Sequence, residues 1–224
     1  MAQTATARES AADLRRTMVE RQMRTFDVFD VGVLAAFDAT PREPFIAADL
    51  AAVAYSDRVL PGRTGERLLL APMILGRLIQ EAAVTSQCRA LDVAGGGYSA
   101  AVLSRLVKSV VAIEDEPEAA QAAAAQLGAL GCANVAARQG DLAKGAPSDG
   151  PFDVILVNGV VETGLDGLLA QLADGGRLLT LEKSGSAVRA VRYDRHGEDV
   201  GKRTLFNASG PALAAFGKAP AFIF

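Results

Sequence analysis

The feature that most constrains the fold is a short apolar run that ends in three glycines and passes directly into a helix-favouring stretch, Leu91-Asp92-Val93-Ala94-Gly95-Gly96-Gly97-Tyr98. Glycine has no Cβ, so its backbone can adopt a positive φ and lie against a ligand that a larger residue would exclude. A helix that begins near Tyr98 also directs unpaired N–H groups toward the loop. The pattern predicts a nucleotide-like cofactor site between a strand and a helix.

Two kinds of cofactor fit this loop. The spacing Gly95-x-Gly97-x-x-Ala100 matches the G-x-G-x-x-A fingerprint of dinucleotide-binding folds. However, Asp92 stands inside the expected strand, where dinucleotide folds usually carry an apolar residue. We therefore favour a site for the adenosine part of S-adenosylmethionine. A glycine-rich turn without a ligand is the simpler alternative.

Strand and helix patterns alternate along most of the chain. The expected helices cover residues 13–23, 31–37, 72–81, 99–106, 117–130 and 165–172, and the expected strands cover 90–93, 109–114, 134–137, 152–157 and 177–181. The apolar run 152–157 is typical of a central strand in a parallel sheet, because such strands are buried on both faces. This alternation predicts an α/β fold with a mostly parallel, doubly wound sheet.

The chain ends are expected to differ from this core. Residues 187–194 and 202–206 flank a turn, which predicts an antiparallel C-terminal hairpin at the sheet edge, and residues 220–224 could add a last short strand. A length of 224 residues favours one large domain with an extension. We expect a flexible N-terminus (1–12), an N-terminal helical extension packed on the core (13–80) and the core itself (81–224).

Composition argues against several classes of partner. The net charge is -3, Trp is absent and aromatic residues make up 5%, so neither nucleic acid nor a membrane is an expected partner. Cys88 and Cys132 are isolated, which predicts reduced, buried thiols and a cytoplasmic protein. The single His196 lies in an expected turn, and no metal site is predicted. The oligomeric state is left open.

Three polar residues end consecutive strand units. Ligands of such sheets bind at the carboxyl ends of the strands. Glu114 can accept hydrogen bonds from two ribose hydroxyls, Asp141 can accept from an adenine amino group, and Asn158 is expected to face the cleft beside the cofactor. Each residue alone is more often a cap or turn residue, but together with the triple glycine they indicate a cofactor site.

Motifs along nearly the whole chain resemble one known family. They are Met18-Val19-Glu20-Arg21-Gln22-Met23, Thr40-Pro41-Arg42-Glu43-Pro44-Phe45, Ala54-Tyr55-Ser56-Asp57 with Leu60-Pro61, Asp92 to Leu103, Ile113-Glu114, Gly140-Asp141 and Pro151-Phe152-Asp153. These stretches resemble the protein-L-isoaspartate O-methyltransferase family. The resemblance implies a Rossmann-like methyltransferase that uses S-adenosylmethionine and methylates the misplaced carboxylate of isoaspartyl residues in damaged proteins, which starts their repair.

The resemblance also implies a set of site residues. Those expected to bind the cofactor are Asp92, Ala94, Gly95, Gly96, Gly97, Tyr98, Ser99, Glu114, Asp115, Asp141, Leu142 and Asn158. Leu70 and Asn158 are the candidates for a catalytic role, and the implied partner is a protein or peptide with isoaspartyl residues.

One stretch departs from the family pattern. The family motif G-x-G-Q-T-I-S-Q-P places a hydroxyl close to the reacting carboxylate, whereas residues 65–72 here read Gly-Glu-Arg-Leu-Leu-Leu-Ala-Pro. Aligning Pro72 puts Leu70 at the serine position and Ala71 at the glutamine, while aligning Gly65 puts Leu69 at the serine. Neither register restores a hydroxyl. Two hypotheses remain open: an isoaspartyl methyltransferase, or a weak or inactive member that binds the cofactor or a protein partner without this transfer.

Overall fold

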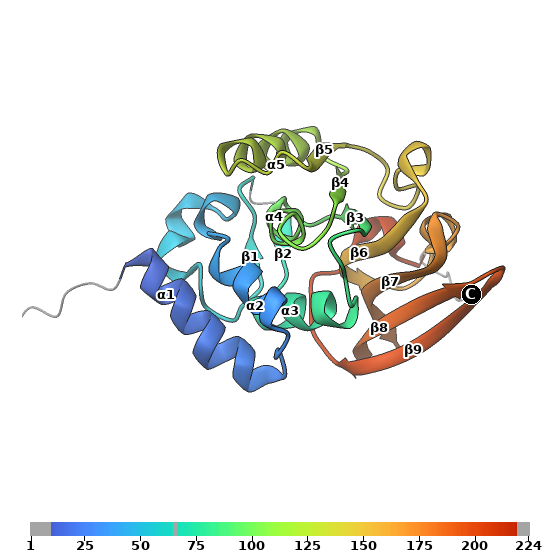
Figure 1. The fold of residues 1–224 in the computed structure, drawn as a ribbon, viewed down its shortest axis with the longest axis horizontal. Helices are drawn as coiled ribbons and strands as arrows, with labels where there is room; N and C mark the ends of the chain where they lie inside the picture. The colour runs from blue at the N-terminus through green and yellow to red at the C-terminus, as the bar shows by residue number, and fades with distance from the viewer. Residues whose placement is uncertain (1–9, 65–66, 219–224) are drawn as a thin grey trace, which may run out of the picture.

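A seven-stranded sheet with the strand order β5-β4-β3-β6-β7-β8-β9 forms the centre of the molecule (Figure 1). The computed structural model describes residues 10–64 and 67–218. The strands are β3 (Arg89–Val93), β4 (Ser109–Glu114), β5 (Val135–Gln139), β6 (Phe152–Val161), β7 (Leu172–Ser184), β8 (Ala187–His196) and β9 (Asp199–Asn207). Strands β3 to β7 pair in parallel, and β8 and β9 add antiparallel pairs. The predicted parallel sheet with an antiparallel C-terminal hairpin is confirmed.

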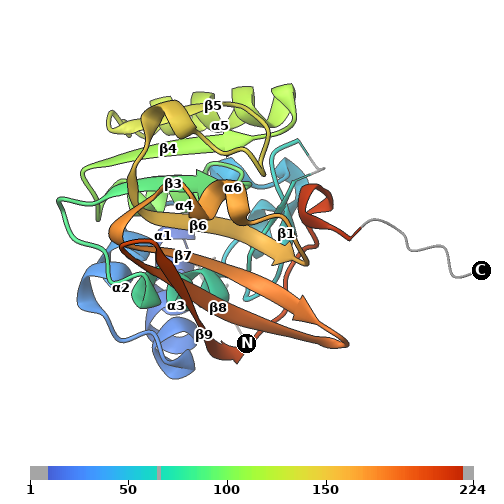
Figure 2. The ribbon, with the colours of Figure 1, turned by 90° about the vertical axis from the view of Figure 1, so that its right-hand side faces the viewer.

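Each face of the sheet is covered by its own hydrophobic layer. The helices are α2 (Val31–Asp38), α3 (Pro72–Glu81), α4 (Tyr98–Leu103), α5 (Pro117–Ala129) and α6 (Asp166–Leu169). Along β6, Val154 and Leu156 pack with α2 to α5, whereas Ile155 and Val157 pack with α6. Figure 2 shows α6 on the face opposite α3. The alternation follows from the two-residue period of a strand.

The N-terminal helix changes geometry along its length. It begins as α1 (Ala11–Thr17), which Ser10 caps, and continues as the π-helical turns η1 (Met18–Met23). Met18 and Met23 are fully buried in the layer on the α3 face. A Cβ at Gly76 of α3 would lie 2.5 Å from Met23 Cε, so the Met23 side chain packs directly against the backbone of α3 at this glycine. The helix expected over 13–23 is therefore present in two geometries.

Between β6 and β7 the chain differs from the expectation of a helix over 165–172. Helix α6 ends at Leu169, and Leu172 already pairs with Phe152 of β6. The backbone N–H of Phe152 donates to the carbonyl of Gln171 at 2.8 Å. Sheet pairing therefore takes Leu172, the last residue of the expected helix, into β7.

Strand β6 is also longer than the expected 152–157. It continues to Val161, because Val160 and Val161 pair with Leu181 and Glu182 after a shift in register. This shift places Asn158 inside the strand rather than after it. The short strand expected over 220–224 lies outside the described residues.

The two cysteines differ in their burial. Cys88 and Cys132 are both free thiols, but Cys132, which follows the turn after α5, is only partly buried, whereas Cys88 is buried. No helix within residues 10–64 and 67–218 is both long and apolar enough to cross a membrane.

Candidate cofactor and acceptor site

The glycine loop joins β3 to α4 through a backbone that few residues can adopt. Ala94, Gly96 and Gly97 have φ values of 59°, 59° and 84°, whereas Gly95 lies outside the left-handed region. A left-handed conformation costs a residue with a Cβ about 1–2 kcal/mol. Such strain at Ala94, with its N–H bound to Ile113 of β4 at 2.9 Å, is a feature that clusters at functional sites.

A side chain at Gly95 would collide with the protein's own side chains. A Cβ there would lie 1.9 Å from Ser99 Oγ and 2.3 Å from Asp92 Oδ2. Ser99 donates to Asp92 at 2.8 Å beneath the loop. Gly95 therefore makes room for this hydrogen bond within the protein.

Asp92 is the centre of a buried polar network. It is 1% exposed, and the Asn158 amide donates to Asp92 at 2.8 Å and to the Val93 carbonyl at 3.0 Å. Burial raises the pKa of Asp92 to about 7, although the hydrogen bonds from Asn158 and Ser99 oppose the shift. Asn158 is 2% exposed, so it holds Asp92 and does not face an open cleft as expected.

Glu114 ends β4 beside the glycine loop. Its Oε1 accepts the N–H of Gly96 at 2.6 Å, and its Oε2 accepts Arg67 Nε at 2.8 Å. Burial raises the pKa of Glu114, and the charge of Arg67 and the Gly96 N–H oppose that rise. The structure thus brings Glu114 to the loop, as the sequence predicts.

Arg67 is a residue of this region that sequence reasoning missed. Besides Glu114, its guanidinium pairs with the Asp115 carboxylate. Leu69 lies over the loop as well, because its Cδ2 is 2.3 Å from where a Cβ of Gly96 would be. The segment from Arg67 to Leu69 therefore lies across the part of the loop that the sequence assigns to a cofactor. The only signal in the sequence is one arginine before a run of leucines.

Asp141 and Leu142 lie at the neighbouring strand end. The Gly140 N–H donates to the Glu114 carbonyl at 2.8 Å, which places Asp141 at the same sheet edge. The exposed Asp141 accepts the N–H groups of Ala143 and Lys144 at 3.0 and 3.2 Å, and the Lys144 N–H contributes most to lowering its pKa. Leu142 is buried in the hydrophobic layer on the α6 face of the sheet.

Tyr98 connects the glycine loop to the segment around Leu70. Its ring is fully buried, and the Arg42 guanidinium lies 5.5 Å from the ring centroid. Arg42 donates to the carbonyls of Leu70 at 2.9 Å and Ala54 at 3.2 Å. This buried cation therefore fixes the backbone of the segment that departs from the family motif.

Leu70 and Ala71 form an apolar wall directly before α3. Leu70 is 2% exposed and Ala71 is 7% exposed. A Cβ at Gly210 would lie 3.0 Å from Leu70 Cδ2, so the Leu70 side chain packs against the chain segment that follows β9. Neither side chain offers a hydrogen-bond donor to a substrate.

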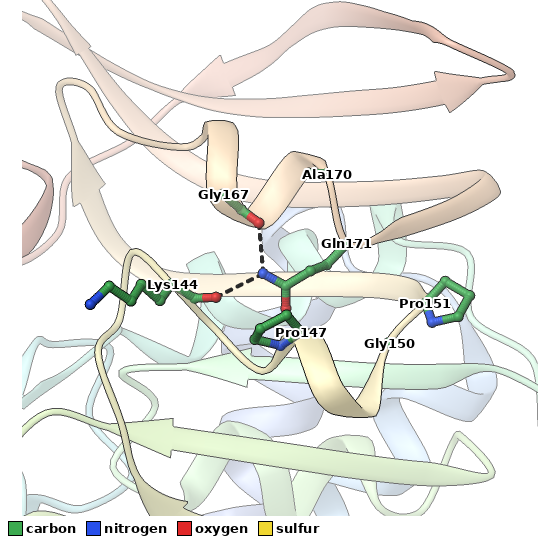
Figure 3. Close-up of a pocket in the computed structure, with 7 residues that line it drawn as sticks. All are labelled: Lys144, Pro147, Gly150, Pro151, Gly167, Ala170 and Gln171. Carbon is green, nitrogen blue, oxygen red and sulfur yellow. Dashed lines mark hydrogen bonds between the residues drawn. The ribbon is translucent and has the colours of Figure 1, made fainter.

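A separate hollow lies at the opposite ends of the strands. It has a volume of about 620 Å³ and lies between the loop of residues 144–151 and α6, as Figure 3 shows. The Gln171 amide donates to the carbonyls of Lys144 and Gly167 at 2.8 and 2.6 Å, and its oxygen accepts the Ala146 N–H at 2.9 Å. These polar atoms are satisfied within the protein, and the hollow is not part of the site at the glycine loop.

The fold and the loop define the class of nucleotide-binding α/β proteins to which methyltransferases belong. A family model described as protein-L-isoaspartate(D-aspartate) O-methyltransferase matches residues 15–206. The chain is 39% identical over 189 residues to the protein-L-isoaspartate O-methyltransferase of Methylorubrum extorquens, covering 84% of this chain and 82% of the relative. It is 32% identical over 196 residues to that of Maricaulis maris, covering 87% of this chain and 92% of the relative.

Solved structures agree on the fold. A protein-L-isoaspartate O-methyltransferase matches with a TM-score of 0.79 at 24% identity over 93% of this chain and 67% of that chain. A Plasmodium falciparum beta-aspartate methyltransferase in complex with S-adenosyl-L-homocysteine matches with a TM-score of 0.76 at 16% identity, over 90% of this chain and 98% of that chain. This chain belongs to the protein-L-isoaspartate O-methyltransferase family. The predicted family, Rossmann-like fold, enzyme class and S-adenosylmethionine cofactor are confirmed.

Proposed function

We propose that this protein transfers a methyl group from S-adenosylmethionine to the side-chain carboxylate of isoaspartyl residues in protein or peptide substrates. The family match supports this function over the alternative of a member without isoaspartyl transfer. Within the structure, the proposal rests on one observation, the contact between Glu114 and the Gly96 N–H at the carboxyl ends of β3 and β4. Parallel α/β sheets bind their ligands at this edge.

The residues around the loop fit an adenosine ligand in two different ways. Gly96, Glu114, Asp115 and Asp141 offer backbone or carboxylate groups that would contact it, with Glu114 assigned to the ribose hydroxyls. The buried residues would support this layer from below. They are Asp92, Ala94, Gly95, Gly97, Tyr98, Ser99, Leu142 and Asn158. This division assigns Asn158 to positioning the loop rather than to contact with the substrate.

The acceptor site would lie against the wall formed by Leu70 and Ala71. When bound, S-adenosylmethionine supplies an electrophilic methyl group, and a carboxylate is already ionised at neutral pH, so its attack needs no general base. The protein's contribution is then to orient the carboxylate oxygen and to exclude water. Arg42 supports this task by holding the Leu70 carbonyl and hence the wall's backbone.

Methyl transfer to a defined peptide tests this function. Purified protein is incubated with tritiated S-adenosylmethionine and either an isoaspartyl peptide or the same peptide with a normal aspartate. We expect base-labile methyl ester on the isoaspartyl peptide alone. Binding of S-adenosyl-L-homocysteine without transfer to this peptide would contradict the assignment of the substrate but not that of the cofactor.

The cellular location of the protein is a further part of the proposal. The two free thiols favour a reducing compartment such as the cytoplasm. The net charge of -3 offers no general attraction for nucleic acid or for an anionic membrane surface. We expect the protein in the soluble fraction of a lysate, and we expect the Cys132 thiol to react with a labelling reagent in intact cells.

A further inference from the structure

Arg67, in the segment before α3, places its positive charge against Glu114, the carboxylate that the proposed function assigns to the ribose. Arg67 Nε donates to Glu114 Oε2 at 2.8 Å, and Nη2 pairs with Asp115. The Arg67 side chain is 13% exposed, so its guanidinium lies in the site rather than in solvent. Its Cγ is 3.5 Å from where a Cβ of Gly96 would be, so the stem of the arginine also covers the loop.

These contacts shield the Glu114 carboxylate from an incoming ligand. The Glu114 side chain is only 3% exposed, and its second oxygen already accepts the Gly96 N–H at 2.6 Å. A ribose diol therefore cannot reach the carboxylate while Arg67 is in place. Both the ribose and Arg67 donate hydrogen bonds, so they are direct competitors for the same oxygen.

We propose that Arg67 sets the cofactor affinity of this protein by competing with the ribose for Glu114, so that cofactor binding requires Arg67 to leave. This inference rests on the cofactor site of the proposed function. A ligand that binds only the fraction of molecules in which Arg67 is displaced has its apparent affinity reduced by that fraction. Arg67 thus inhibits ribose binding at Glu114 from within the same chain.

The surrounding structure allows this exchange without unfolding. Arg67 directly precedes β2 (Leu68–Leu69), which pairs with β1 (Leu60–Pro61) in a two-stranded sheet separate from the central one. Leu69 is buried and anchors the backbone, whereas the long Arg67 side chain can rotate away. No hydrogen bond of the seven-stranded sheet has to break.

The proposal is tested by titrating S-adenosyl-L-homocysteine calorimetrically. The variant Arg67→Met removes the charge but keeps an apolar stem over Gly96, and Arg67→Lys keeps the charge. The matched control is Arg63→Ala, because Arg63 is exposed and has no ion pair within the described residues. Melting temperatures verify that every variant is folded.

We expect Arg67→Met to bind about tenfold more tightly than the unaltered protein. Arg67→Lys should fall between the two, and Arg63→Ala should match the unaltered protein.

Other outcomes separate this inference from the proposed function. Equal affinities would overturn the competition, and weaker binding by Arg67→Met would overturn it by showing that Arg67 contacts the cofactor. Binding by Arg67→Met alone would support the competition in its strongest form. If no variant binds S-adenosyl-L-homocysteine, the proposed cofactor site fails and the inference fails with it.

Discussion

Replacing Gly95 by alanine should destabilise the protein because the new methyl group has no room. Its Cβ would lie 1.9 Å from Ser99 Oγ and 2.3 Å from Asp92 Oδ2, both too close for any real contact. The φ of Gly95 is outside the left-handed region, so the cost comes from this overlap and not from the backbone. Separating Ser99 from Asp92 loses a hydrogen bond to a buried carboxylate, which is worth about 1.5–3 kcal/mol. With the strain of moving both groups, we expect a loss of about 3 kcal/mol.

Thermal and urea unfolding measure this loss. For a protein of this size, 1 kcal/mol shifts the midpoint by about 2–4 °C, so Gly95→Ala should melt about 6–12 °C lower. The matched control is Gly128→Ala in α5, where no atom lies within 4 Å of the new Cβ. That substitution should instead stabilise the protein by about 0.5–1 kcal/mol, because glycine is a poor helix residue.

A double variant identifies the cause. In Gly95→Ala with Ser99→Ala the nearest atom is gone, so the combined loss should be smaller than the sum of the two single losses. Refutation would come from a Gly95→Ala protein as stable as the unaltered one, or from strictly additive losses. Either result would mean that Gly95 is not required by the Asp92 network.

Three further predictions concern the same region. Burial raises the pKa of Asp92 in the folded state to about 7 from the ordinary 3.8, so the folded state binds the proton more tightly, and the free energy of unfolding should rise by roughly 2–3 kcal/mol as pH falls from 7 to 5. Urea unfolding of Asp92→Asn should lack this rise. Identical pH profiles of stability for the variant and the unaltered protein would contradict the prediction. Glu114→Gln should weaken S-adenosyl-L-homocysteine binding roughly tenfold in calorimetry, whereas the exposed Glu116→Gln should not, and equal effects would exclude the ribose assignment. Leu70→Ser with Ala71→Gln should raise the rate of isoaspartyl methylation while the exposed Leu68→Ser leaves it unchanged, and a slower double variant would show that the apolar wall itself positions the substrate.

The fold could be predicted because its signals are local. Apolar runs such as 152–157 reflect burial on both faces, and Asp30 caps α2 through a bond of 2.9 Å to Val33, three residues away. The predicted boundaries of helices and strands were wrong where pairing with another strand determines them. Leu172 belongs to β7 because Phe152 pairs with it, and nothing near Leu172 in the sequence reports that pairing.

The candidate site was predictable only in part, for the same reason. Glu114 could be placed because its strand ends there, and the carboxyl ends of parallel strands share one edge. Arg67 could not be placed, because its bond to Glu114 spans 47 residues along the chain. Asn158 was misplaced because a register shift extends β6 beyond it and turns its amide toward Asp92.

The buried guanidinium of Arg42 explains how the acceptor wall keeps its shape without the family's hydroxyl. Burial lowers the pKa of Arg42, and no carboxylate within the described residues lies close enough to pair with it. Its charge is solvated by backbone carbonyls instead, including that of Leu70, and it lies over the ring of Tyr98 at the start of α4. The same cation therefore fixes the wall relative to the helix that follows the glycine loop. Because transfer to an ionised carboxylate depends on alignment more than on proton transfer, we propose that this fixed backbone supports the alignment of the substrate carboxylate even without a side-chain hydroxyl.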